Sequence, residues 1–283
     1  MVIKIAHLGP AGTNAEAAAF TYQEWLQREQ PQDVILAPCQ NIAQSLYSLA
    51  QDDVDLAVVP IENSIQGSVA ISLDLVWELH PLSICHQIIL PIYHSLISFA
   101  PDFEHIKTVH SHPQALAQCQ RWLETHIPHA PLIEENSTTK ILQHLEGQPD
   151  IAAIASPRAA QLYKLPMLAE TINDSPENCT RFWVLGKTSQ SEGEVISLAF
   201  TLPAKIPGVL VDALEVFARR KINLSRIESR PTKKSLGEYL FFVDLDGCLS
   251  DQTVKDALQE LQAHTEILKI FGNYRTIPQA IPA

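Results

Sequence analysis

The sequence is poor in positive charge, in paired cysteines and in long apolar runs. Its 283 residues include 20 Lys and Arg against 32 Asp and Glu, which gives a formal net charge of -12. Such an acidic surface repels the phosphate backbone of nucleic acids unless basic residues form a separate patch. No segment of the sequence is rich in basic residues. We therefore expect no nucleic acid among the partners of this protein.

The five cysteines occur singly, and no two form a CxxC pair. An odd number of isolated cysteines indicates reduced thiols and disfavours a disulfide framework or a structural zinc site. The longest uncharged stretch, residues 83–101, contains His86, Gln87 and His94, which are costly in hydrocarbon. The first apolar run is interrupted by Lys4 and is too short for a secretory signal. We expect a cytoplasmic protein that does not enter a membrane.

Apolar residues make up 46% of the chain, and charged residues 18%. This balance is typical of a globular protein, and the length suggests about two domains. Apolar runs alternate with helical patterns, which predicts βαβ units and a largely parallel sheet. The expected strands cover residues 2–8, 34–37, 56–61, 84–90, 108–110, 131–133 and 151–154. One helix is expected to begin after Asn41, and the others are expected over residues 113–126, 138–145 and 157–163.

These elements predict an α/β domain at residues 1–187 with two lobes. We place lobe one at about residues 1–82 plus 164–187 and lobe two at about residues 83–163, with the ligand site in the cleft between them. A polar segment without periodicity then precedes a βαββαβ order, typical of a ferredoxin-like unit, at residues 194–272. A unit this small tends to pair with a second copy, so we expect a homodimer or homotetramer, with a loose tail at residues 273–283.

Five polar segments could form a site. The first is a strand-to-helix turn at residues 8–14, where Gly9 and Gly12 allow a tight backbone turn. The unpaired N–H groups of the following helix can then hold an anion without a lysine. A simple turn capped by Thr13 or Asn14 is the alternative interpretation.

The second segment follows a buried strand with the polar residues Glu62, Asn63 and Ser64, and Gly67 comes shortly after them. In open α/β folds, ligands bind at the carboxyl edge of the sheet, where this strand ends. We therefore expect this segment to contribute to the site.

The third segment, residues 109–116, leads from a strand into a helix. His105, His110 and His112 suggest a metal, but no carboxylate or cysteine joins them as a convincing third ligand, so we expect no metal and no cofactor. Ser111 or His112 either caps the helix or contacts a substrate, and both interpretations stay open.

The fourth segment leads into a strand with Thr180, a hydrogen-bond donor, and Arg181, a cation. An exposed strand face is the alternative, and Cys179 is interpreted as a packed thiol. The fifth segment, residues 222–231, offers backbone donors, a carboxylate and two guanidinium groups around one small pocket, which suits a zwitterion. An ordinary loop with solvated charges is the alternative there.

Together these segments make the sequence similar to the prephenate dehydratase family. The resemblance covers nearly the whole chain and rests on Glu-Asn-Ser at residues 62–64, Ser-His-Pro-Gln-Ala at 111–115, Thr-Arg-Phe at 180–182 and Glu-Ser-Arg-Pro at 228–231. It implies a lyase of phenylalanine biosynthesis that converts prephenate into phenylpyruvate, water and carbon dioxide. We expect a monofunctional form, because no chorismate mutase helices precede Met1.

The resemblance also implies a catalytic domain like a type II periplasmic binding protein, followed by an ACT domain that binds phenylalanine as a feedback inhibitor. It implies that Thr180 is essential, and we expect Thr180 to donate a hydrogen bond to the leaving hydroxyl group with help from Arg181, while Glu62 and His112 are rival acids. The expected substrate-binding residues are Thr13, Asn63, Ser64, Gly67, Ser111, Gln114 and Phe182. The expected phenylalanine-binding residues are Gly208, Leu210, Asn223, Leu224, Glu228, Ser229 and Arg230.

Two other functions fit the same features. Arogenate, in which an amine replaces the keto group, is a rival substrate. Two lobes around a cleft also describe non-catalytic proteins that bind small molecules.

Overall fold

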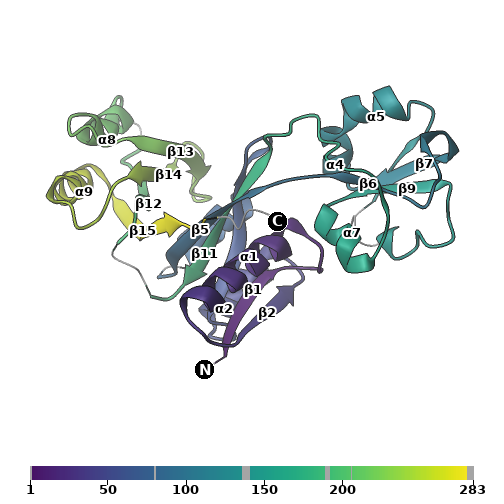
Figure 1. Ribbon diagram of the computed structural model, residues 1–283. Coiled ribbons are helices and arrows are strands. Elements are labelled where there is room, and N and C mark those ends of the chain that lie inside the picture. Colours follow the sequence, from purple (N-terminus) through teal and green to yellow (C-terminus); the bar gives the residue numbers. More distant parts are fainter. Residues whose placement is uncertain (1, 80, 136–140, 189–191, 205, 279–283) are drawn as a thin grey trace.

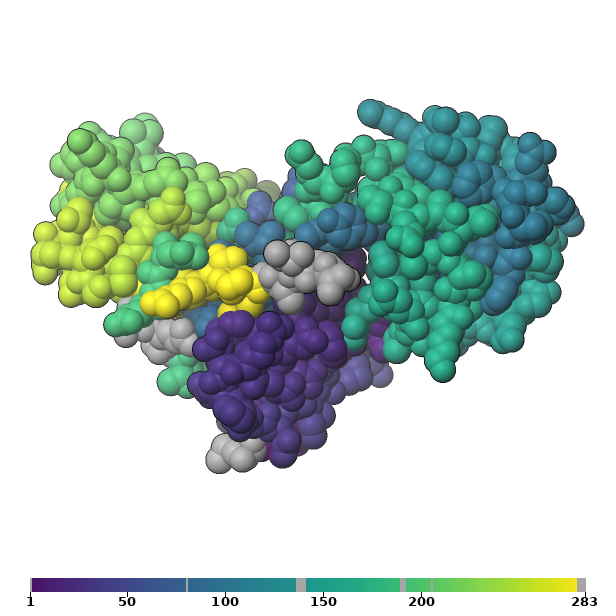
Figure 2. Space-filling view, in the orientation of Figure 1, coloured from purple at the N-terminus to yellow at the C-terminus, as the bar shows by residue number. Residues whose placement is uncertain are grey.

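The computed structural model describes residues 2–79, 81–135, 141–188, 192–204 and 206–278. The chain forms two α/β lobes and a C-terminal unit, with the C-terminal unit and lobe two on opposite sides of lobe one (Figure 1). The space-filling view shows a broad notch between these two outer parts (Figure 2). Within the described ranges, no helix is both long and apolar enough to cross a membrane.

Lobe one is a mixed sheet with helices on both faces. Its strands are β1 (Ile3–Leu8), β2 (Val34–Cys39), β3 (Leu56–Asn63), the short β4 (Gly67–Ser68), β5 (Ser83–Pro91) and β11 (Cys179–Gly186). The order β5-β11-β3-β1-β2 is parallel from β3 to β2, whereas β11 is antiparallel to both of its neighbours. Helix α1 (Asn14–Glu29) packs on one face, and α2 (Ile42–Ala50) and α3 (Ala70–Glu78) pack on the other.

Two helices of lobe one begin at predicted caps. The hydroxyl group of Thr13 accepts a hydrogen bond from the Glu16 N–H (3.2 Å), and the side chain of Asn41 accepts one from the Gln44 N–H (2.8 Å). Each cap pairs one N–H group that the helix itself cannot pair. These caps therefore define where α1 begins after β1 and where α2 begins after β2.

Lobe two is a five-stranded sheet of order β10-β6-β9-β7-β8. Its strands are β6 (Ser95–Ile97), β7 (Thr108–Ser111), β8 (Leu132–Glu134), β9 (Ile151–Ala155) and β10 (Met167–Ala169). Its helices are α4 (Pro113–Gln118), α5 (Gln120–His126) and α7 (Pro157–Tyr163), with a 3-10 turn, η1, at Phe103–His105.

The lobe boundaries differ from those we expected. Strand β5, expected to open lobe two, pairs with β11 in the sheet of lobe one, and β10, expected in lobe one, pairs with β6 in lobe two. The apolar run of β5 predicts a strand that is buried on both faces. It does not indicate which sheet buries the strand, because that depends on partners far away in the sequence.

The helix expected over residues 113–126 is two helices, which meet at Cys119. The Asp174 carboxylate accepts hydrogen bonds from the N–H groups of Arg121 (3.0 Å) and Trp122 (3.1 Å), so a distant residue caps the start of α5. The first residues of the helix expected over 138–145 lie outside the described residues.

The C-terminal unit has the predicted ferredoxin-like order. Its elements are β12 (Val195–Thr201), α8 (Val209–Ala218), β13 (Leu224–Pro231), β14 (Tyr239–Asp246), α9 (Gln252–His264) and β15 (Ile267–Thr276). The strands lie in the antiparallel order β13-β14-β12-β15. Helices α8 and α9 cover one face, and the other face packs into the core of lobe one through Leu240, Phe242 and Phe271.

Strand β15 is longer than predicted, and it joins the two sheets. Its last residues, Arg275 and Thr276, pair with His86 and Gln87 of β5, so that one ten-stranded sheet extends from β13 to β2. Residues 273–276, which we expected in the loose tail, therefore lie in the strand, and Ile277 after them is buried. The apolar pattern ends earlier because Gly272 and Asn273 interrupt it.

The approach of β15 to β5 gives a test of this junction. A Cβ atom at Gly272 would lie 2.5 Å from the carbonyl oxygen of Ile84. Gly272→Ala is therefore expected to lower the free energy of unfolding by about 1 to 3 kcal/mol, measured by urea unfolding. Ile270→Ala, at a position 37% exposed in the same strand, is the control and should cost less. Full stability of the Gly272→Ala protein would contradict this close contact.

Candidate active site

A cleft of about 520 Å³ lies between the two lobes. Strands β1, β3, β7 and β9 all end at this cleft, as ligand-binding strands do in open α/β sheets. Five of the predicted catalytic and substrate-binding residues line it, namely Thr13, Asn63, His112, Gln114 and Thr180. The other polar side chains on its wall belong to Asn14, Gln40, His94, Gln118 and Ser156.

The turn between β1 and α1 presents the start of a long helix to the cleft. Gly12 takes a left-handed backbone conformation (φ 88°), and Thr13 caps the helix while its hydroxyl group donates to the Leu8 carbonyl (3.1 Å). The capped-turn interpretation therefore holds, and the turn still lines the cleft. The dipole of the 16-residue α1 favours an anion at this end.

Asn63 and Thr180 form a hydrogen-bonded pair across β3 and β11. The Asn63 carbonyl oxygen accepts from the N–H groups of Ile65 and Gln66 (both 3.1 Å), which fixes the orientation of the amide. The Asn63 amide nitrogen consequently faces β11 and donates to the Thr180 hydroxyl oxygen (2.9 Å). Because that oxygen already accepts a hydrogen bond, the Thr180 hydroxyl proton is available to a ligand in the cleft.

A buried polar chain continues from this pair into lobe two. Asn63 also donates to the side-chain oxygen of Asn178 (2.8 Å), and Asn178 donates to Gln118 (3.1 Å). The same Gln118 oxygen lies 2.9 Å from Nε2 of His94. The amide nitrogen of Gln118 has no hydrogen-bond partner among the described residues, so it is a spare donor at the cleft wall.

Sequence reasoning did not find His94 and Gln118, because their partners lie far away in the sequence and no motif marks either residue. Asn178, in contrast, lies two residues before Thr180, so its position in the sequence indicated that it could be near the site. Burial lowers the pKa of His94, and the hydrogen bond to Gln118 opposes this only in part. His94 is therefore neutral, and its Nε2–H donates to Gln118.

His112 lines the cleft and also caps α4. Its Nδ1 accepts a hydrogen bond from the Gln114 N–H (3.3 Å), which leaves the proton on Nε2. Its capping and cleft-lining positions are thus compatible. The other two histidines considered for a metal have separate partners, Asp102 for His105 and Glu135 for His110.

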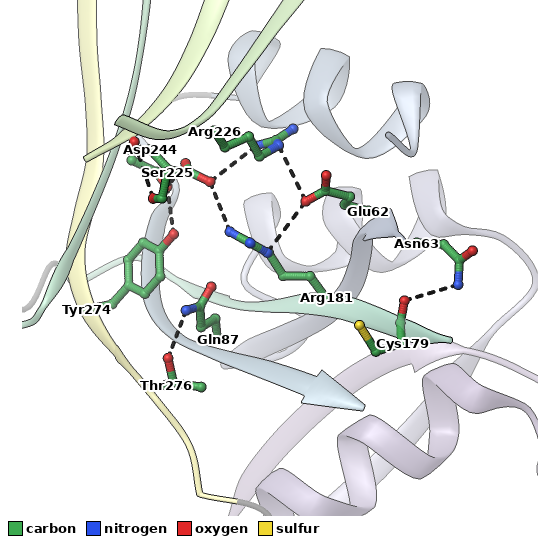
Figure 3. Close-up of polar contacts among 11 residues, drawn as sticks. Glu62, Asn63, Gln87, Cys179, Arg181, Ser225, Arg226, Asp244, Tyr274 and Thr276 are labelled. Carbon is green, nitrogen blue, oxygen red and sulfur yellow. Dashed lines mark hydrogen bonds and ion pairs between the residues drawn. The ribbon is translucent and has the colours of Figure 1, made fainter. Parts of the chain in front are cut away.

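Glu62 and Arg181, both predicted to be catalytic, lie outside the cleft. They are opposite each other in β3 and β11, one position beyond Asn63 and Thr180. Side chains of a strand alternate between faces, so these two charges point to the C-terminal unit rather than to the cleft (Figure 3). This placement does not fit a direct catalytic role for either residue.

Four predicted substrate-binding residues also do not line the cleft. Phe182 is 1% exposed in the core beneath α1, and the hydroxyl group of Ser111 donates to the Ile154 carbonyl inside lobe two (2.6 Å). Ser64 accepts a hydrogen bond from the Cys179 N–H (3.0 Å), and Gly67 begins β4, where it pairs with Asn63. These residues support the wall of the site from behind.

No lysine or arginine is found among the described residues that line the cleft. Its polar groups are hydroxyls, amides, imidazoles and backbone N–H groups. An anion bound there is held by dipoles whose field is local, so the acidic surface of the protein does not oppose it.

The two lobes are clamped together beside the cleft. Arg158 of α7 forms a bidentate ion pair with Glu16 of α1 (both contacts 2.5 Å), and its guanidinium group lies 4.3 Å from the ring centre of Phe20. Ser156 donates to the Gly12 carbonyl (2.9 Å). These contacts hold the start of α7 against the turn between β1 and α1.

The predicted phenylalanine-binding residues are divided between two ends of the C-terminal sheet. Gly208 begins α8, and Leu210 lines a hollow of about 390 Å³ with Tyr239 and Phe241. Asn223 binds Asp246 (2.7 Å) at the opposite end, about 20 Å away along β13. Between these ends, Leu224, Glu228 and Ser229 follow β13, and Arg230 donates to Asp74 of lobe one (3.1 Å).

The chain matches the family model for prephenate dehydratase over residues 5–190 and that for the ACT domain over residues 197–263. It is 36% identical to the prephenate dehydratase of Lactococcus lactis, over 96% of this chain and 97% of that one. It is 38% identical to the bifunctional chorismate mutase/prephenate dehydratase of Aquifex aeolicus, over 96% of this chain and 73% of that one. The crystal structure of prephenate dehydratase from Arthrobacter aurescens in complex with L-Phe is similar to this structure, with a TM-score of 0.84 and 33% sequence identity. The similarity covers 99% of this chain and 93% of that chain.

The clamp between the lobes predicts a pH-dependent stability. Burial would raise the pKa of Glu16, but the hydrogen bond and charge of Arg158 outweigh it, and the pKa lies below its usual value. The ion pair thus stabilises the fold above about pH 4 and is lost as the pH falls through the lowered pKa. Glu16→Gln is expected to cost about 1 to 2 kcal/mol at neutral pH, seen as a lower Tm, and progressively less in acid.

Glu29→Gln is the matched control on the same helix, because Glu29 is exposed and no ion pair is found for it among the described residues. It should leave Tm nearly unchanged. An equal decrease in Tm for the two variants, or a decrease for Glu16→Gln that persists in acid, would contradict the stabilising role of this ion pair.

Proposed function

Because the chain belongs to the prephenate dehydratase family, we propose that prephenate binds in the cleft between the lobes and that Thr180 is the hydrogen-bond donor to its leaving hydroxyl group. The single observation behind this assignment is the Asn63–Thr180 hydrogen bond (2.9 Å), which turns the free hydroxyl proton of Thr180 towards the cleft. The reaction of the family converts prephenate into phenylpyruvate, water and carbon dioxide.

The chemistry requires two bonds of the substrate to break. The carbon–carbon bond to the ring carboxylate breaks and leaves its electron pair in the ring, which becomes aromatic as the carbon–oxygen bond to the hydroxyl group breaks. The departing oxygen gains charge and needs a proton to leave as water. A donor placed at that oxygen stabilises the transition state more than the bound substrate.

A threonine hydroxyl group is a weak acid, so its contribution is a well-placed hydrogen bond. Asn63 orients Thr180, and Asn63 is itself oriented by two backbone N–H groups. Of the two rival acids, only His112 lines the cleft, whereas Glu62 faces the ACT domain. Thr180 therefore has the better-supported geometry among the candidates.

The second carboxylate of prephenate needs an anchor. We place it at the amino end of α1, within reach of the backbone of residues 9–13, with Gln114 and the spare amide donor of Gln118 on the facing wall. A cation beside the departing carboxylate would hold the charge that must be lost as carbon dioxide forms. A wall of neutral donors avoids that stabilisation of the ground state.

Phenylalanine regulates the enzyme at the ACT domain, and we assign the effector site to the two groups of residues at the ends of β13. A single phenylalanine can contact both groups only if they come from two copies of the chain, since about 20 Å of strand separates them within one copy. This supports the proposal of a homodimer or homotetramer. A cytoplasmic location is part of the same proposal.

Replacement of Thr180 tests the catalytic assignment. Thr180→Ala is expected to lower kcat by about 10² to 10⁴, whereas Thr180→Ser should retain most of the activity because it keeps the donor. Turnover is followed at saturating prephenate by the absorbance of phenylpyruvate. His112→Asn is the comparison and should stay within about tenfold of the wild type. An equally large loss for His112→Asn would transfer the donor role to His112.

The cleft also predicts the substrate. Arogenate carries an ammonium group where prephenate has a keto group, and none of the described lining residues is a carboxylate that could pair with it. The value of kcat/KM is therefore expected to be at least about tenfold higher for prephenate, the worth of one charged hydrogen bond. A preference for arogenate would contradict this, and binding of either compound without turnover would indicate a non-catalytic binding protein.

A further inference from the structure

We propose that Arg226 couples the ACT domain to Asn63 and Thr180 through four charged residues, here called the interdomain charge ring. The ring consists of Glu62, Arg181, Arg226 and Asp244. This inference rests on the proposed function, because its test reads prephenate turnover and the inhibition of that turnover by phenylalanine.

The ring is formed by two cross-strand pairs that face each other. Glu62 and Arg181 are opposite in β3 and β11 of the catalytic domain, and Arg226 and Asp244 are opposite in β13 and β14 of the ACT domain. Charges of opposite sign alternate around the ring, so that each carboxylate lies between two guanidinium groups (Figure 3). The ring is therefore a neutral contact to which each domain contributes one acid and one base.

The ring is one residue away from the proposed catalytic pair on both strands. Asn63 follows Glu62, Thr180 precedes Arg181, and the Asn63–Thr180 register pair adjoins the Glu62–Arg181 pair. A register shift between Arg181 and Phe182 interrupts the ladder at this point, and such irregularities allow a strand to redirect a side chain. A displacement of Glu62 or Arg181 thus changes the direction of Thr180 on the opposite face.

One member of the ring is held firmly. Asp244 is 1% exposed, accepts a hydrogen bond from Ser197, and is bonded by Arg181 (3.1 Å). The Ser197 hydroxyl group in turn lies 2.6 Å from that of Tyr274. Asp244 is therefore a fixed point, and the side chains around it are the parts that can move.

Arg226 is held loosely, although its side chain is only 5% exposed. It lies 3.7 Å from Glu62 and 3.5 Å from Asp244, and none of its guanidinium nitrogens has a hydrogen bond among the described residues. Charge-assisted hydrogen bonds are usually 2.7 to 2.9 Å long, about 0.7 Å shorter than these contacts. A small movement of β13 towards β3 would form such bonds, and a small movement away would break the contact with Glu62. Arg226 can thus gain or lose contacts when β13 shifts.

Strand β13 connects this arginine to the assigned effector site. Glu228, Ser229 and Arg230 follow Arg226 along the strand, and Arg230 makes a second contact with lobe one through Asp74. Because the assigned effector site includes residues at both ends of β13, an effector bound there acts on a strand that touches the catalytic domain at both points. Arg226 is the point that lies next to the catalytic pair.

A purely structural role for the ring makes a different prediction. A buried ion cluster that only attaches two domains changes stability when it is broken, but it leaves the effect of phenylalanine on turnover intact. The quantity that separates the two roles is the coupling factor, defined as kcat/KM without phenylalanine divided by kcat/KM at saturating phenylalanine.

The experiment uses the full chain with Arg226→Met, Arg226→Lys and Glu62→Gln. The coupling factor is measured by phenylpyruvate formation, and phenylalanine binding is measured separately by calorimetry. Arg226→Met and Glu62→Gln are expected to reduce the coupling factor at least fivefold while phenylalanine still binds, and Arg226→Lys should keep more of it. The coupling factor of the double variant Glu62→Gln/Arg226→Met should be no lower than that of either single variant, because both substitutions break the same contact between the domains.

Lys233→Met is the matched control, because Lys233 also makes an ion pair across the domain interface, with Asp74 (2.8 Å). Its coupling factor should equal that of the wild type. A coupling factor within twofold of the wild type in Glu62→Gln, which lies on the catalytic side, would overturn the proposal even if Arg226→Met fails to fold. Failure of the proposed function would look different, since the wild type would then form no phenylpyruvate in the absence of phenylalanine.

Discussion

The antiparallel pairing of β3 with β11 is the constraint on which the other features depend. It places an asparagine opposite a threonine and, one position further, a glutamate opposite an arginine. Because side chains alternate along a strand, the neutral pair faces the substrate cleft and the charged pair faces the regulatory domain. Two adjacent residues on each strand thus face two different surfaces, and the same backbone carries both pairs.

Charged and neutral groups are distributed between these surfaces in a consistent way. Ion pairs lie where parts of the chain meet: Arg158 with Glu16 between the lobes, and Arg226 and Arg230 with acids at the domain interface. The described wall of the cleft has hydroxyl and amide groups instead. This separation lets a protein of net charge -12 bind a dianion without a strong attraction to the carboxylate that must leave.

Local signals in the sequence were sufficient for the parts of the fold that neighbouring residues determine. The caps at Thr13 and Asn41 and the order of the ferredoxin-like unit were predictable because each depends on a few adjacent positions. The importance of Thr180 was implied by the family resemblance, because the residues alone place it only at the start of a strand. What could not be predicted depends on distant partners: Asp174 breaks a helix that it meets only in the folded protein.

The candidate site shows the same limit. Thr180 and Arg181 are neighbours in the sequence, so a motif assigns both to one site, whereas the sheet places them on opposite faces. Gln118 and His94 give no local signal, because a buried amide or imidazole is indistinguishable from a satisfied core residue until its partners are known. Resemblance to a family identifies which residues matter more readily than it identifies what each of them touches.

The continuous sheet across the two domains has a consequence for how such a chain can be shortened. Without β15, the backbone groups of β5 that it now pairs would face solvent, and β5 would become an open edge of the catalytic sheet. Open edges recruit other strands and promote aggregation. The regulatory domain therefore also covers one edge of the catalytic sheet, and a truncation before β15 would expose that edge.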